Sequence, residues 1–206
     1  MRATQFVEKS LDARAWRKQS RALRRSADVL WDDFSVILTI DAVAWKKNNE
    51  YDFSPAIEAL ETTKFLYGLA LETALKAWLI ENFPEKIEIL LSISGDGSAK
   101  HAELKSFGVA PNQGHNILVL AEAAGVFRPD FDSVIKSNQD IAAIKNIFRD
   151  LGEVVVWRGR YPVPMSSREP LSMDPKAPEA ALAHYLRDWL DPILDKLLTE
   201  TSREPS

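Results

Sequence analysis

The 206-residue chain contains no cysteine, and this absence excludes several classes of protein at once. Disulfide scaffolds, thiolate zinc sites and cysteine nucleophiles all require that residue. Only 8 glycines and 11 prolines occur, which excludes a collagen-like or low-complexity chain. Because 46% of the residues are hydrophobic, the composition indicates one globular domain with a sizeable core, or one domain with an appended arm.

Long apolar runs are also lacking. The longest, such as residues 69–71 and 77–80, fall far short of the roughly 20 residues that span a bilayer. No charged-then-apolar secretory signal opens the chain. We therefore expect a soluble, cytoplasmic protein with no membrane association.

Motifs for metals, cofactors and covalent catalysis are missing. The three histidines, His101, His115 and His184, are too scattered for a zinc motif, so we expect no metal site. The chain has no phosphate-binding glycine-rich loop, no Gly-x-Ser-x-Gly elbow and no kinase signature. The sequence therefore predicts no cofactor and assigns no catalytic residue.

Charge is distributed unevenly along the chain. Residues 1–27 hold 8 Lys and Arg against 2 acidic residues, whereas the remainder carries a net charge of −10. Four arginines recur three and four apart, on what the spacing predicts to be the outer face of a helix: Arg14, Arg17, Arg21 and Arg24. Such a basic arm can bind nucleic acid, and it can equally pair with the protein's own acidic surface.

Hydrophobic spacing predicts helices along most of the chain. Helices are expected over residues 16–47, 54–82 (with Ser54 as N-cap and Pro55 in the first turn), 117–124, 132–156 and 177–199. Residues 84–113 carry turn residues, and no strand alternation persists long enough to predict a sheet. The prediction is an all-α bundle of four to five main helices. In it, a basic amphipathic helix at 1–50 packs on a bundle at 51–200, with a proline-rich loop at 158–178 and a disordered tail at 201–206.

Two polar clusters are candidates for function. Glu72 and Lys76 lie four residues apart on the most apolar helix, where they form either a surface salt bridge or the lining of a cleft. Arg158, Arg160 and Tyr161 are held close together by the turn residues around them. They either bind a carboxylate, a phosphate or a base, or they attach the loop to the bundle.

Three segments together resemble a family of bacterial helical proteins. They are Tyr67–Ala77, with its Glu-x-x-Leu-Lys pattern, Gly114–Leu118 and Trp157–Pro164. The chain resembles HEPN (higher eukaryote and prokaryote nucleotide-binding) domains over about residues 55–198. Asn116 stands where the family usually has Asp, which keeps helix-capping ability and loses the charge.

The resemblance implies a HEPN-like fold and a nucleotide, RNA or protein partner, often in a homodimer and in a defence or toxin–antitoxin context. The predicted binding face combines six residues: Glu72, Lys76, His115, Arg158, Arg160 and Tyr161. The family's ribonuclease signature, an Arg followed four to six residues later by a His, is absent. Two alternatives remain open: a metal-independent ribonuclease using His115 with Arg158 or Arg160, and a purely structural or regulatory oligomer subunit. If His115 belongs to the site, it must lie within hydrogen-bond reach of the face that carries Glu72 and Lys76.

Overall fold

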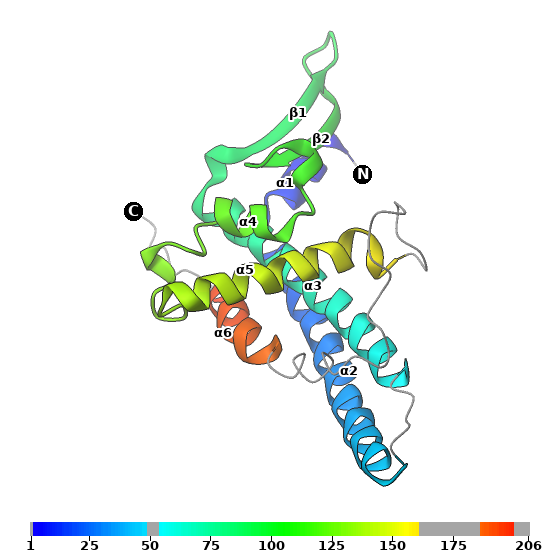
Figure 1. The fold of residues 1–206 in the computed structure, drawn as a ribbon. Helices are drawn as coiled ribbons and strands as arrows, with labels where there is room; N and C mark the ends of the chain where they lie inside the picture. Colours follow the sequence, from blue (N-terminus) through cyan, green and yellow to red (C-terminus); the bar gives the residue numbers. More distant parts are fainter. Residues whose placement is uncertain (1, 49–53, 161–185, 200–206) are drawn as a thin grey trace.

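A computed structural model describes the chain except for residues 1, 49–53, 161–185 and 200–206. The described residues form six α-helices and one two-stranded antiparallel sheet (Figure 1). The prediction of a mainly helical protein is confirmed, whereas the expectation that no sheet forms is wrong. The proposed tail at 201–206 lies outside the described residues.

Two long helices, α2 (Ala13–Asn48) and α3 (Ser54–Asn82), run side by side in opposite directions (Figure 1). The stripe of α2 that packs inward includes Ala27, Trp31 and Phe34. The structure divides the single helix predicted over residues 1–50 into α2 and a shorter helix, α1 (Ala3–Ser10), that precedes it. The prediction that α3 runs from Ser54 to Asn82 is confirmed, because Pro55 suits a first turn and Pro84 follows the last.

Helix α3 is the centre of the molecule. It is buried on most of its circumference, and it contacts α2, α4, α5 and α6. Its fully buried side chains include Leu60, Tyr67, Leu71 and Leu75. A helix that is apolar on most sides is stable only when other helices cover those sides.

No helix in the described ranges is long and apolar enough to cross a membrane.

The sheet is a hairpin of β1 (Ile87–Ile93) and β2 (Ala99–Phe107), preceded by a single 3-10 turn, η1 (Pro84–Lys86). Leu91 pairs with Ala102, and a left-handed Gly97 helps to form the turn. The hairpin extends away from the helices, and α1 lies beside it (Figure 1). Sequence periodicity missed it because β1 is mostly exposed and therefore shows no alternation between buried and exposed faces.

The second half of the chain builds the remaining layer. Short 3-10 turns, η2 (Pro111–Gln113) and η3 (Pro129–Phe131), flank α4 (Ile117–Ala123), and Gly125 follows the end of α4 in the left-handed conformation. Helix α5 (Asn138–Glu153) begins six residues later than predicted, because Ser137 caps it.

A π-helical turn, η4 (Val154–Arg158), continues α5 in place of the predicted last α-helical turn. Helix α6 (Leu186–Leu198) then packs against α2 and α3, with Pro192 inside it. The predicted first residues of this last helix, 177–185, lie outside the described part of the chain.

Candidate functional site

The candidate site starts from a buried ion pair on α3. Glu72 and Lys76 face the same side because four residues make about one helical turn. Their side chains are 6% and 7% exposed, and Lys76 Nζ lies 2.6 Å from Glu72 Oε1. The sequence left open a surface salt bridge or a cleft lining. The pair is not on the surface, so removing either charge would take away the closest partner of the other in the interior.

Aromatic rings complete the surroundings of Lys76. Its ammonium nitrogen lies 4.9 Å from the centroid of the Phe107 ring and 5.8 Å from that of Trp16, and these two rings meet edge to face. Phe107 ends β2 and Trp16 belongs to α2, so the hairpin and two helices meet around this ammonium group. The π faces attract the cation and partly replace its lost hydration.

His115 approaches the same carboxylate from the loop before α4. Asn116 caps α4, because its side chain accepts a hydrogen bond from the Val119 backbone N–H at 3.2 Å. This cap places His115 immediately outside the helix, where its Nδ1 lies 3.0 Å from Glu72 Oε1. The expectation that His115 reaches the face of Glu72 and Lys76 is confirmed.

The hydrogen bond to Glu72 determines how the imidazole can act. An ionised carboxylate only accepts hydrogen bonds, so the proton of this bond belongs to Nδ1. The His115 side chain is 65% exposed, and Nε2 has no hydrogen-bond partner among the described residues. A neutral ring therefore offers the lone pair of Nε2 to a ligand, and a protonated ring offers a donor.

Glu72 also has an unused acceptor. Both Lys76 and His115 contact Oε1, whereas Oε2 is enclosed and has no hydrogen-bond partner in the described part of the chain. Buried polar atoms without partners are uncommon in folded proteins, and they are associated with bound water or a functional role. This oxygen distinguishes the cluster from an ordinary structural ion pair.

Arg158 does not join this site. Its guanidinium contacts Asp150 and lies 2.9 Å from Glu61 Oε2, and Lys64 contacts both of these carboxylates. Burial alone would lower the pKa of Arg158, but the two carboxylates outweigh it and raise that pKa. Glu61 precedes Glu72 by 11 residues on α3, or roughly 16 Å along the axis. The six-residue binding face predicted from the sequence is therefore not one site.

The other members of that predicted face have separate outcomes. Arg160 lies over the Phe65 ring, with its guanidinium carbon 6.0 Å from the centroid. Phe65 is seven residues before Glu72, or roughly 10 Å along the axis of α3, so Arg160 lies at a different level of this helix from Glu72. Tyr161 lies outside the described residues. The cluster of Glu72, Lys76 and His115 is thus the part of the prediction that the fold brings together.

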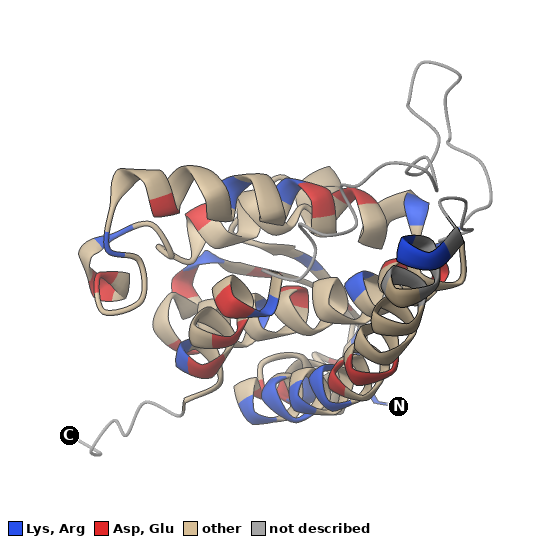
Figure 2. Ribbon diagram, turned by 60° about the horizontal axis from the view of Figure 1, so that its bottom comes forward, with Lys and Arg blue, Asp and Glu red and all other residues tan. Residues whose placement is uncertain are grey.

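Three of the four arginines that the sequence places on one face of the basic arm bond within the molecule. Arg17 is fully buried and bonds to Glu81 and to the Leu197 carbonyl, so placing it on the outer face was wrong. Arg21 donates to the Leu198 carbonyl at 2.7 Å, and Arg24 pairs with two acids of α6. Of the four predicted arginines, Arg14 has no side-chain partner in the described ranges. Figure 2 shows the Lys and Arg positions gathered along the first half of α2.

A metal centre is not indicated. No group of three or more His, Asp or Glu side chains among the described residues is arranged to hold a metal ion. Comparison of the chain with protein-family models, curated proteins and solved structures found no match. Functional inference therefore depends on the geometry around Glu72.

Sequence reasoning missed two parts of this region. It did not find Trp16 and Phe107 as neighbours of Lys76, because they come from elements 60 and 31 residues away in the chain. It also missed two further cations of α2, Lys18 and Arg25, which continue the spacing of Arg14 and Arg21. A count at three- and four-residue steps from Arg14 would have found them.

Proposed function

We propose that this chain is a HEPN-like helical module that binds a nucleotide or RNA at the cluster of Glu72, Lys76 and His115. The observation that carries the proposal is the 3.0 Å contact between His115 Nδ1 and Glu72 Oε1. It joins two motifs that lie 43 residues apart in the chain. These are two of the three segments on which the HEPN resemblance depends. A shared binding site would explain why both segments occur in one chain.

The charges of the cluster suit a phosphorylated ligand. Glu72 and Lys76 cancel, so protonation of His115 gives the cluster a net charge of +1. A protonated imidazole fixed by a buried carboxylate donates Nε2–H to a phosphate oxygen, and such charge-assisted hydrogen bonds are stronger than neutral ones. The neutral ring instead accepts from a base amino group or a ribose hydroxyl.

A ribonuclease is the second activity compatible with His115. The imidazole oriented by Glu72 has the arrangement of a general base, because the carboxylate keeps the proton on Nδ1 and leaves Nε2 to accept one. A cation for the phosphate must also be close. Arg158 does not supply it, since Glu61 and Asp150 hold its guanidinium elsewhere on α3. Binding without cleavage is therefore the function that the geometry supports better.

Calorimetric titration with ATP, GTP, their monophosphates and a single-stranded RNA tests the proposal. His115→Gln removes the imidazole ring at an exposed position, so we expect the fold to be retained. We expect it to weaken binding at least tenfold, about 1.4 kcal/mol. The matched control is His101→Gln, which changes an exposed histidine of β2 that bonds to no side chain in the described chain.

Three outcomes are decisive. Weakening by His115→Gln and not by His101→Gln supports the site. Absence of binding by the unmodified protein contradicts the proposal and favours a structural or regulatory subunit. RNA cleavage that is lost with His115→Gln establishes the ribonuclease instead.

A further inference from the structure

The first half of α2 carries a second row of cations, which shares only Arg21 with the arginines that bond to α6. Four exposed side chains recur at steps of four, three and four: Arg14, Lys18, Arg21 and Arg25. These steps place them on one side of the helix over roughly 16 Å. Arg21 donates to the Leu198 carbonyl. The other three have no acidic partner among the described residues.

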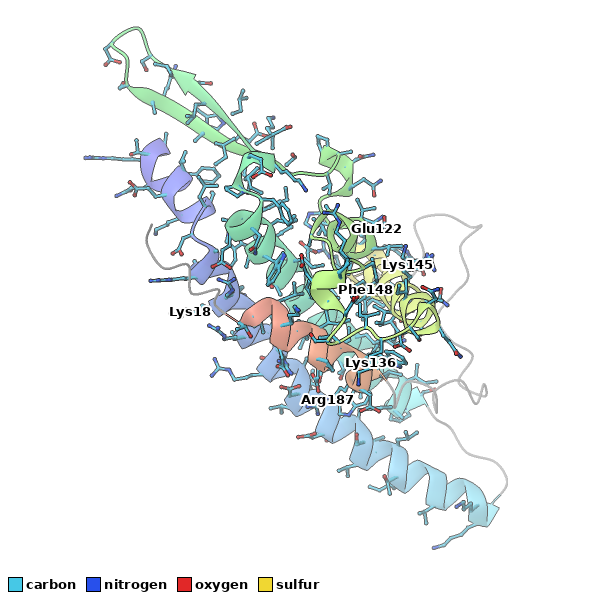
Figure 3. All side chains as sticks on the ribbon, turned by 90° about the vertical axis from the view of Figure 1, so that its left-hand side faces the viewer. Lys18, Glu122, Lys136, Lys145, Phe148 and Arg187 are labelled. Atoms are coloured by element: carbon cyan, nitrogen blue, oxygen red, sulfur yellow. The ribbon has the colours of Figure 1, made fainter. Side chains whose placement is uncertain are left out.

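A groove between α2 and α6 collects most of this row. Its volume is about 680 Å³, and its lining is Lys18, Arg21, Arg24, Arg25, Asp28, Asp195, Leu198 and Thr199. Figure 3 shows Lys18 on α2 beside the end of α6. The lining of the groove includes none of Glu72, Lys76 and His115, so the groove is separate from the candidate site.

The acids of the groove are already neutralised by other groups. Asp195 pairs with Arg24, and the burial of Arg24 is outweighed by its acidic partners, which raise its pKa. Asp28 accepts the hydroxyl of Tyr67 and lies 3.5 Å from Arg187. The positive charge of Lys18, Arg21 and Arg25 is therefore left without a matching negative charge, although the whole chain carries −4.

We infer that this groove binds the phosphodiester backbone of a nucleic acid. A row of cations about 16 Å long matches a repeating anion better than a single phosphate group. The lining contains one large apolar side chain, Leu198, and no aromatic ring. Protein interfaces need an apolar core with aromatic anchors, so an acidic protein fits this surface poorly. Without groups that read bases, the contact is independent of sequence.

Fluorescence anisotropy with oligonucleotides of equal length, over a series of salt concentrations, tests the inference. The arms are single-stranded RNA, single-stranded DNA and duplex DNA, with polyglutamate as an acidic polymer lacking phosphate. The variant is Lys18→Gln with Arg25→Gln, which leaves Arg21 and its bond to α6 intact. The matched control is Lys46→Gln with Lys47→Gln, which removes two exposed cations from the other end of the same helix.

We expect the Lys18 and Arg25 variant to bind at least tenfold more weakly at low salt. Its plot of log affinity against log salt should be shallower by about 1.4 for single strands, since each lost phosphate contact contributes about 0.7. The Lys46 and Lys47 control should retain the affinity and slope of the unmodified protein. The arm bound most tightly identifies the kind of nucleic acid.

The experiments distinguish the groove between α2 and α6 from the site around His115. Binding of no oligonucleotide, equal weakening in the control variant, or equally tight binding of polyglutamate would each overturn it. His115→Gln should leave the salt slope unchanged, and the Lys18 and Arg25 variant should leave mononucleotide binding unchanged.

Discussion

Replacing Lys76 with methionine tests how the site is held together. Methionine keeps the length of the side chain and its contact with Trp16 and Phe107, and it removes the ammonium group. Glu72 then loses the cation that lies 2.6 Å from Oε1 and keeps only His115 as a partner of this oxygen. Its other oxygen, Oε2, already has no hydrogen-bond partner among the described residues. Breaking a buried pair by removing one partner costs about 3 to 5 kcal/mol. We expect a loss of stability near the lower value, because His115 still contacts the carboxylate.

The double variant Lys76→Met with Glu72→Leu should recover most of that loss, because no buried charge then remains unpaired. Urea unfolding followed by tryptophan fluorescence measures each free energy of unfolding, and 6 tryptophans supply the signal. Lys145→Met is the matched control, because Lys145 pairs with Glu122 and their side chains are 31% and 49% exposed. Both residues are labelled in Figure 3. It should cost less than about 1 kcal/mol. Equal costs for Lys76→Met and Lys145→Met, or additive losses in the double variant, would refute the account of a buried pair.

Three further predictions concern the helices that support the site. A Cβ on Gly68 would lie 2.5 Å from Val155 Cγ2, whereas one on Gly152 would meet nothing closer than 3.8 Å. Thermal unfolding should therefore show Gly68→Ala destabilised by about 1 to 2 kcal/mol and Gly152→Ala stabilised by up to about 1 kcal/mol. Burial of the Tyr67 hydroxyl and its hydrogen bond to Asp28 raise the pKa of Tyr67. The unfolded chain thus ionises first, and native stability should fall by about 1.4 kcal/mol per pH unit above about pH 10. In Tyr67→Phe, that slope should be absent from alkaline urea titrations. Urea titration should also show that Arg158→Gln costs roughly 2 kcal/mol and that Arg160→Gln costs under about 1 kcal/mol, because the first is held by two carboxylates and the second is exposed.

Local signals were sufficient for several elements of the fold. Ser54 and Pro55 marked the start of α3, and Asn116 marked the start of α4. These residues act through their own backbone neighbours, so their effect does not depend on the rest of the molecule. The approach of His115 to Glu72 was also predictable, but through the family resemblance and not through spacing.

Other features depended on partners distant in the sequence. Arg17 was expected on the outer face, yet it bonds to Glu81 and to the end of α6. Steps of three and four residues connect Arg17 with Ala27 and Trp31, which face the core. This shared helix face could have predicted that Arg17 is buried. Arg158 gave no comparable signal, because Glu61 lies 97 residues away in the chain. A tertiary ion pair of that separation leaves no periodic pattern.

Nuclear magnetic resonance of the histidine rings during nucleotide titration tests the binding site at Glu72, Lys76 and His115 most directly. The chain has three histidines, so single His→Gln variants assign every ring signal. We expect His115 to carry its proton on Nδ1 in the free protein, and we expect its Nε2 signal to shift when ATP or GTP is added. The signals of His101 and His184 should remain unchanged. A His115 signal that does not respond to any nucleotide, or equal shifts at all three rings, would contradict the assignment of a binding site to Glu72, Lys76 and His115.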